Sequence, residues 1–112
     1  MTLPLSGIRV LDLTNVLAGP YCSMVLGDMG AEVIKIENAD KGDISRSFEP
    51  QVNAESYCFA VLNRNKKSVA LNLKDPAGLK IALMLASKAD IVLENFRPGV
   101  VQRMGLGYAS VK

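Results

Sequence analysis

Apolar residues in this chain of 112 residues gather into short runs separated by amphipathic stretches. Residues 8–13 and 31–37 are rich in Val, Ile and Leu and predict two buried strands. Between them, residues 20–30 carry apolar positions at helical spacing, with Pro20 suited to a first helical position and Gly30 to a helix stop. A strand, a helix and a strand in this order predict a right-handed βαβ unit with a parallel pair of strands.

The same alternation returns in the second half of the chain. Residues 68–73 and 90–95 predict two more strands. Asp75 suits an N-cap and Pro76 a first turn, so a helix is predicted over 76–87. These elements complete a second βαβ unit. We therefore predict an α/β protein with a Rossmann-like open parallel sheet built from two βαβ units.

Shorter segments fill the rest of the pattern. Residues 38–50 show neither period and are predicted to be a loop, whereas 56–62 and 100–104 suit short helices. Residues 63–67 predict a polar turn. Residues 105–112 begin another periodic stretch that stops at Lys112, which suggests a chain fragment.

Composition indicates one folded unit, and we expect residues 1–112 to form a single Rossmann-like domain fragment. With 49% hydrophobic and 21% charged residues, the chain is not typical of disorder. The helix over 76–87 is apolar nearly all round, so we expect it to be covered on two sides. Such a domain would leave apolar surface for a partner chain or for a further part of its own chain.

Charge and special residues exclude several classes of function. The net charge of +2 is too small to favour nucleic acid, and no apolar run is long enough for a membrane span. The absence of histidine excludes Ser-His-Asp and Cys-His nucleophiles within the chain, and Cys22 and Cys58 lack zinc spacing, so no metal site is expected. Residues 1–6 do not resemble a secretory leader, and a cytoplasmic location is expected.

Candidate binding residues follow the predicted strands. Residues 16–18, Lys74 and 95–97 lie at the carboxyl ends of three strands, the edge where open α/β sheets bind ligands. The first of these loops lacks the GxGxxG fingerprint, which argues against NAD or FAD. Glu37 lies where a ribose-binding acid would lie, but a solvated strand-end carboxylate is the favoured interpretation.

Two basic clusters allow more than one interpretation. Arg64, Lys66 and Lys67 could hold a phosphate or form a solvated turn, and composition favours the solvated turn. Arg97 and Arg103 have the same ambiguity. Their position near the other candidate loops favours binding.

Five blocks in order resemble the N-terminal region of the class III CoA-transferases. That family includes formyl-CoA and carnitine CoA-transferases and, by shared ancestry, 2-methylacyl-CoA racemases. The blocks cover almost the whole chain and comprise residues 7–37, Gly42-Asp43, 63–78, 89–100 and 103–108.

The resemblance implies a set of residues that bind coenzyme A. The first-loop residues would lie along the pantetheine and pyrophosphate, the third-strand residues would contact the adenosine portion, and those after the fourth strand would complete the site. The candidates are Val16, Leu17, Ala18, Asn38, Leu71, Lys74, Asn95, Phe96, Arg97 and Arg103. Asn38 stands where some relatives carry an arginine that meets the nucleotide. Leu17 replaces a glutamine of the formyl-CoA branch, which argues against that acceptor.

The resemblance also implies the chemistry and the partners. In the family, an aspartate attacks an acyl-CoA thioester, and a carboxylic acid acceptor resolves the resulting intermediates. That aspartate is expected beyond Lys112, so this chain alone is expected to be inactive. Family members form interlocked homodimers, which we expect of the full-length protein. A racemase of the same superfamily and a non-catalytic Rossmann-like binding module remain as alternatives.

Overall fold

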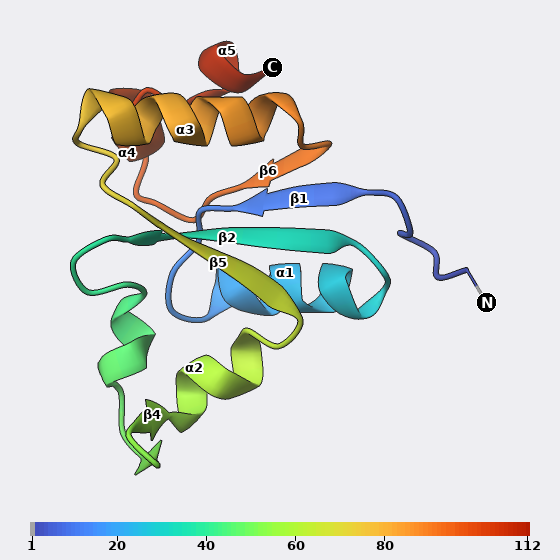
Figure 1. The fold of residues 1–112 in the computed structure, drawn as a ribbon, viewed down its shortest axis with the longest axis vertical. Coiled ribbons are helices and arrows are strands. Elements are labelled where there is room, and N and C mark those ends of the chain that lie inside the picture. Colours follow the sequence, from blue (N-terminus) through green and yellow to red (C-terminus); the bar gives the residue numbers. More distant parts are fainter. Residues whose placement is uncertain (1) are drawn as a thin grey trace.

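A parallel sheet of four strands forms the centre of the computed structural model, which describes residues 2–112 (Figure 1). The strand order across the sheet is β5-β2-β1-β6. The strands are β1 (Arg9–Asp12), β2 (Glu32–Asn38), β5 (Lys66–Leu71) and β6 (Ile91–Leu93). The predicted α/β class with an open parallel sheet is confirmed.

Helices cover both faces of this sheet. Helix α1 (Ala18–Asp28) joins β1 to its neighbour β2, and α3 (Pro76–Ser87) joins β5 to β6, at the two edges of the sheet. The two connections run in opposite directions across the sheet. Because crossovers between parallel strands are right-handed, opposite directions place α1 and α3 on opposite faces (Figure 1).

Each face of the sheet has its own apolar core. Beneath α3, the core contains Leu11, Leu13 and Ile36 from the strands and Ala82 and Ala86 from the helix. The other face carries a smaller cluster with Val10, Ala31 and Val33 at its centre. Alternation along β1 and β2 assigns neighbouring residues to opposite faces, as the period of a strand requires.

Several boundaries differ from the predicted ones. Helix α1 begins at Ala18 rather than at Pro20, because a proline fits anywhere in a first helical turn, where its missing N–H has no partner to lose. Strand β5 begins at Lys66, inside the predicted polar turn. The predicted loop 38–50 contains a 3₁₀ helix, η1 (Ile44–Ser47), capped by the side chain of Asp43.

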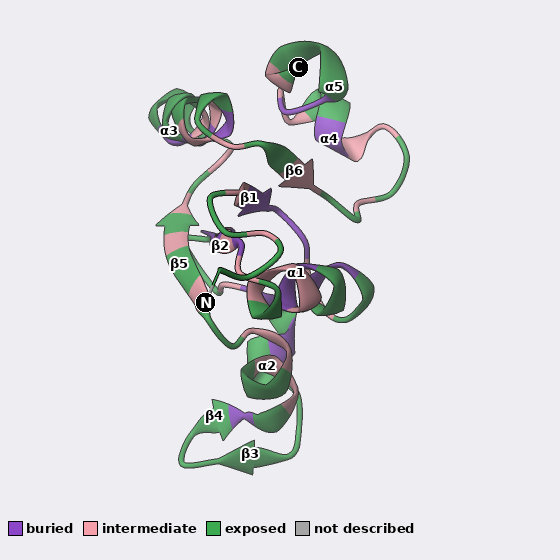
Figure 2. Cartoon of the chain, turned by 90° about the vertical axis from the view of Figure 1, so that its right-hand side faces the viewer, coloured by how far each residue is buried: buried purple, intermediate pink, exposed green. Residues whose placement is uncertain are grey.

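Short elements complete the chain. A small hairpin that the sequence did not predict projects from the body of the molecule (Figure 2). The short helices near 56–62 and 100–104 are confirmed. These elements are β3 (Gln51–Val52), β4 (Glu55–Ser56), α2 (Tyr57–Leu62), α4 (Val100–Arg103) and α5 (Tyr108–Val111).

The outer face of α3 differs from expectation. Ala82 and Ala86 are buried, but Ile81 and Met84 are 45% and 56% exposed, so residues 2–112 cover this helix on one side and not on two (Figure 2). None of the helices described is long and apolar enough to span a membrane.

Candidate functional site

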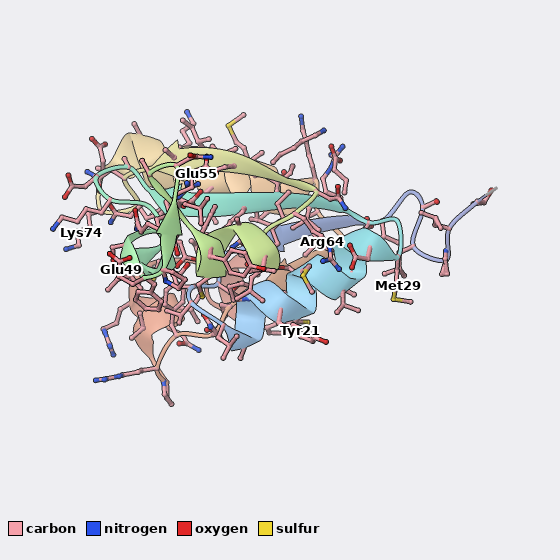
Figure 3. All side chains as sticks on the ribbon, turned by 90° about the horizontal axis from the view of Figure 1, so that it is seen from below. Tyr21, Met29, Glu49, Glu55, Arg64 and Lys74 are labelled. Carbon is pink, nitrogen blue, oxygen red and sulfur yellow. The ribbon has the colours of Figure 1, made fainter. Side chains whose placement is uncertain are left out.

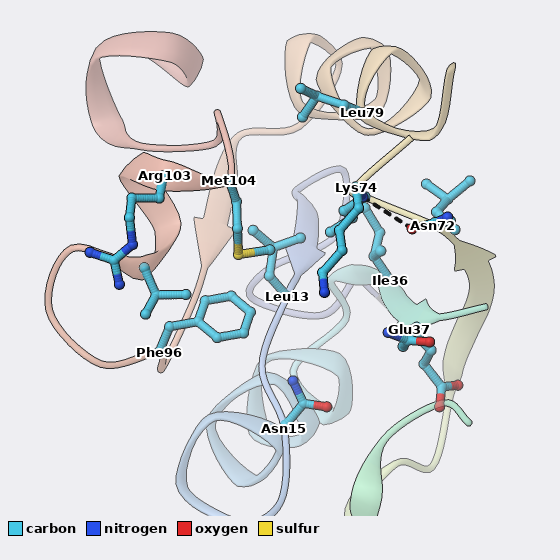
Figure 4. A pocket seen from close by; sticks show the side chains of 14 residues that line it. Leu13, Asn15, Ile36, Glu37, Asn72, Lys74, Leu79, Phe96, Arg103 and Met104 are labelled. Atoms are coloured by element: carbon cyan, nitrogen blue, oxygen red, sulfur yellow. Dashed lines mark hydrogen bonds between the residues drawn. The ribbon is translucent and has the colours of Figure 1, made fainter. Parts of the chain in front are cut away.

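A pocket of about 670 Å³ opens at the carboxyl edge of the sheet (Figure 4). Its walls come from the ends of β1, β2 and β5, from α3, from the segment after β6 and from α4. Its lining comprises Leu13, Asn15, Ile36, Glu37, Asn38, Leu71, Asn72, Leu73, Lys74, Leu79, Phe96, Val100, Arg103 and Met104. The carboxyl edge was the predicted location of a ligand site.

The structure brings half of the predicted site residues together in this pocket. Asn38, Leu71, Lys74, Phe96 and Arg103 line it, although they come from four separate segments of the chain. The other candidates lie outside its lining. They are Val16, Leu17, Ala18, Asn95 and Arg97.

The pocket lining combines apolar side chains with two cationic ones. Leu13, Ile36 and Phe96 contribute apolar surface, whereas Lys74 and Arg103 are exposed cations on opposite walls (Figure 4). An apolar cavity with a few charged groups suits a ligand that combines a flat apolar part with anionic groups.

Asn95, which does not line the pocket, forms a bridge to the first loop. Its side-chain oxygen accepts from the Asn15 N–H at 3.1 Å, and its amide nitrogen donates to the Asn15 carbonyl at 2.9 Å. Asn95 therefore ties the loop after β1 to the segment after β6 and fixes Asn15 in the pocket wall. The sequence signal for Asn15 was its place in the first loop. Nothing in the pattern indicated the bridge to Asn95.

The loop between β1 and α1 is tightly packed against the helix start. Thr14 donates through its N–H, at 2.8 Å, and through its hydroxyl to the Asp12 carboxylate. A Cβ on Gly19 would lie 2.2 Å from the Cβ of Thr14, so only glycine lets the helix approach this closely. Leu17, at 59% exposure, and Ala18 are left at the surface.

Buried ion pairs lie behind this loop, on the α1 face of the sheet. Lys66 and Asp12 pair at 3.2 Å, and Lys35 and Asp43 at 3.0 Å, with all four side chains almost completely buried. Burial lowers the pKa of Lys66, and the nearby Asp12 carboxylate opposes that shift. Burial alone would raise the pKa of Asp43, but hydrogen bonds from Ser45 and the Lys35 ammonium outweigh it and lower the pKa.

Neither interpretation of the basic cluster at 64–67 holds for Lys66. Its ammonium is buried and also donates to the Pro20 carbonyl at 3.0 Å and to Asn63 at 2.8 Å, so it is neither solvated nor free for a phosphate. Arg64 pairs with Asp28 at 2.6 Å. The cluster lies at the amino end of β5, whereas Lys74 follows the carboxyl end of that strand. Arg64 and Lys74 therefore lie well apart (Figure 3).

Glu37 also differs from expectation, because it is 4% exposed rather than solvated. Arg46 donates to both of its carboxylate oxygens at 2.7 Å, and Ser68 and the Asp43 N–H donate as well. Burial opposes ionisation, but these donors together hold the pKa of Glu37 at about 2. The carboxylate is thus already engaged within the protein.

Comparison with known proteins assigns the chain to a family. A family model described as CoA-transferase family III matches residues 5–112. The chain is 54% identical over 109 residues to succinyl-CoA:glutarate CoA-transferase of Mus musculus, covering 96% of this chain and 25% of that protein. It is 42% identical over 113 residues to formyl-CoA:oxalate CoA-transferase of Afipia carboxidovorans, covering 100% of this chain and 27% of that protein.

Solved structures agree with the sequence comparison. A CAIB/BAIF family protein from Brucella suis superimposes with a TM-score of 0.91 at 34% identity, covering 99% of this chain and 30% of that one. The chain thus spans about a quarter of the length of the curated relatives described above. The ordered blocks, the parallel sheet and the match over residues 5–112 lead to one conclusion: this chain belongs to CoA-transferase family III.

Proposed function

We propose that this chain is the N-terminal part of an acyl-CoA:carboxylate CoA-transferase and supplies part of its coenzyme A site. The observation that carries the proposal is the pocket at the carboxyl edge, where apolar surface from Leu13, Ile36 and Phe96 lies between the cations Lys74 and Arg103. Coenzyme A offers an adenine for the apolar surface and phosphates for the cations. The names of the relatives support a CoA thioester as one substrate and a carboxylic acid as the other.

Within the proposal, the candidate residues of the pocket and of the first loop contact different parts of coenzyme A. Lys74 and Arg103 bind phosphate groups, and Leu71 and Phe96 contact the adenine. Val16, Leu17 and Ala18, which lie outside the pocket, extend the site along the outer part of the ligand. Asn38 lines the pocket without a charge, so it adds no ion pair to the nucleotide.

The nucleophile belongs to another part of the protein in this proposal. No aspartate lines the pocket in the part of the chain that the structure describes. Asp12 and Asp43 are held in buried ion pairs, and Asp75 caps α3. These engagements support the expectation that the 112 residues alone do not transfer CoA. The full-length protein is proposed to act as a homodimer, which agrees with the uncovered apolar face of α3.

Calorimetry of CoA binding to the full-length protein tests the site. Lys74→Ala and Arg103→Ala are each expected to raise the dissociation constant about tenfold, because a charge-assisted hydrogen bond to phosphate contributes about 1.5 kcal/mol or more. Lys80→Ala provides the matched control, since Lys80 is an exposed lysine of α3 that does not line the pocket. Unchanged affinity in both pocket variants would remove the site assignment.

A further inference from the structure

Val16 has a backbone conformation that its side chain disfavours. Its φ angle is +73°, in the left-handed region, where a β-branched residue is a rare outlier. Asn, Asp and Gly reach this region more easily, yet the sequence places valine here. Such a conformation persists only where surrounding groups enforce it, and it is most often found at functional sites.

The group that accepts a hydrogen bond from the Val16 N–H is a carboxylate from a different part of the chain. The Val16 N–H donates to Asp43, with distances of 3.2 Å to Oδ1 and 3.4 Å to Oδ2. Asp43 is itself completely buried and immobilised. It accepts from the Ser45 N–H at 2.9 Å and from the Ser45 hydroxyl at 2.8 Å, and it pairs with Lys35 at 3.0 Å.

Lys35 holds the same loop from a second point. Its ammonium donates to the Thr14 carbonyl at 2.8 Å, two residues before the N–H that Asp43 accepts. The two members of the ion pair therefore form hydrogen bonds to the backbone on both sides of Asn15, which lies in the pocket wall. Leu17 follows directly after Val16 and is exposed, so its direction depends on the turn made at Val16.

We propose that Asp43, supported by Lys35, is a positioning residue that imposes the left-handed turn at Val16 and so shapes the CoA-binding loop 16–18. This inference rests on the proposed function. It assigns a function to Asp43 of the Gly42-Asp43 block, which does not line the pocket. A buried ion pair adds little net stability compared with apolar side chains of equal size, whereas it can specify one conformation.

The test uses the full-length protein and a neutral background, so that no variant leaves a buried charge unpaired. Lys35→Met with Asp43→Asn keeps one carbonyl oxygen for the Val16 N–H, whereas Lys35→Met with Asp43→Ala removes it. Each pair is made with Val16 and with Val16→Gly, because glycine adopts a positive φ without steric cost. Asp40→Ala, an exposed carboxylate of the same loop, is the control.

In the Val16 background, the Asp43→Ala pair is expected to bind CoA about tenfold more weakly than the Asp43→Asn pair. In the Val16→Gly background, this difference is expected to shrink to about twofold, because glycine no longer needs the carboxylate to hold the turn. A fully additive effect, with the same ratio in both backgrounds, would overturn the inference. Asp40→Ala is expected to bind CoA like the wild type.

Crystal structures of the same variants report the φ angle of residue 16 without any ligand. A change to negative φ in the Asp43→Ala pair supports the inference, and a retained φ near +73° overturns it. If the wild-type protein fails to bind CoA, the proposed function is lost, but the crystal structures still decide whether Asp43 sets the turn. The two failures are therefore distinguishable.

Discussion

At the scale of single residues, the α1 face of the sheet changes character along its strands. Near the amino ends it is apolar, with Val10 and Val33, and toward the carboxyl ends it carries Asp12, Lys35 and Glu37. In the part of the chain that the structure describes, every buried side-chain nitrogen and oxygen has a hydrogen-bond partner. Removing one partner would leave a buried polar group unsatisfied, at a cost of about 1–3 kcal/mol.

Acid sensitivity follows from the Glu37–Arg46 pair. The pKa of Glu37 falls from 4.5 to about 2 on folding, so its contribution to stability is complete above pH 4.5 and is lost as the pH falls toward 2. The shift corresponds to a contribution on the order of 3 kcal/mol to the free energy of unfolding. Urea unfolding of the full-length protein at several pH values between 5 and 2 is expected to show a weaker pH dependence for Glu37→Gln than for the wild type.

Glu49→Gln, at an exposed position, serves as the control and is expected to follow the wild type. The pKa of Asp43 is also lowered, so some acid sensitivity is expected to remain in Glu37→Gln. Identical pH dependence in Glu37→Gln and in the wild type would contradict a stabilising role for this ion pair.

At the scale of elements, α3 is fixed to the sheet by the close approach of its first turn. Gly78 lies against the segment after β5, where an added Cβ would be 2.1 Å from the Asn72 carbonyl oxygen. Asn72 and Leu79 both line the pocket, so this contact sets the distance between two of its walls. The helical period predicted α3 correctly, but the approach at Gly78 exists only in three dimensions.

Gly78→Ala is expected to lower the free energy of unfolding by about 1–3 kcal/mol, because the backbone must move to admit the methyl group. Gly27→Ala is the matched control, since a Cβ there meets Val33 at 3.4 Å, an ordinary contact distance, and the lost flexibility of the unfolded chain stabilises the helix by about 0.5–1 kcal/mol. Urea unfolding of both variants measures whether the free energy of unfolding falls in Gly78→Ala and rises in Gly27→Ala. Equal effects at the two positions would contradict the close approach.

At the scale of the whole molecule, α3 carries large apolar side chains that the described part of the chain leaves exposed. Ile81 and Met84 lie one turn apart on α3 and are both exposed. Neighbouring apolar side chains exposed on a helix suit an interface with another chain or another part of the same protein. In the proposed homodimer, the partner subunit would cover this face of α3.

Residues 1–112, produced alone, are expected to self-associate through this surface and to show no CoA transfer. Size-exclusion chromatography with light scattering measures the association, and a transfer assay on the same preparation measures activity. Replacing both Ile81 and Met84 by lysine is expected to shift the chain toward the monomer, whereas Lys80→Gln on the same helix is expected to leave it unchanged. A well-behaved monomer of the unmodified chain would contradict this expectation.

The sequence by itself determined the strands and main helices, and the edge of the sheet that carries the pocket. Hydrophobic period, the Asp75-Pro76 helix start and the turn residues are local signals, so α3, α2 and the four strands were predictable. Lys74 and Arg103 were found because they follow strands or lie in blocks of the resemblance, and carboxyl ends of parallel strands always meet at one edge.

Only the tertiary structure decided which side chains meet. Lys66 pairs with an aspartate of β1, and Asp43 and Glu37 pair with residues across the turn between β2 and η1. No periodic pattern encodes such pairs. The bridge between Asn15 and Asn95 joins residues 80 positions apart in the sequence. The turn at Val16 depends on Asp43, against the preference of valine itself. The sequence alone singled out the first loop, whereas the shape of that loop depends on residues outside it.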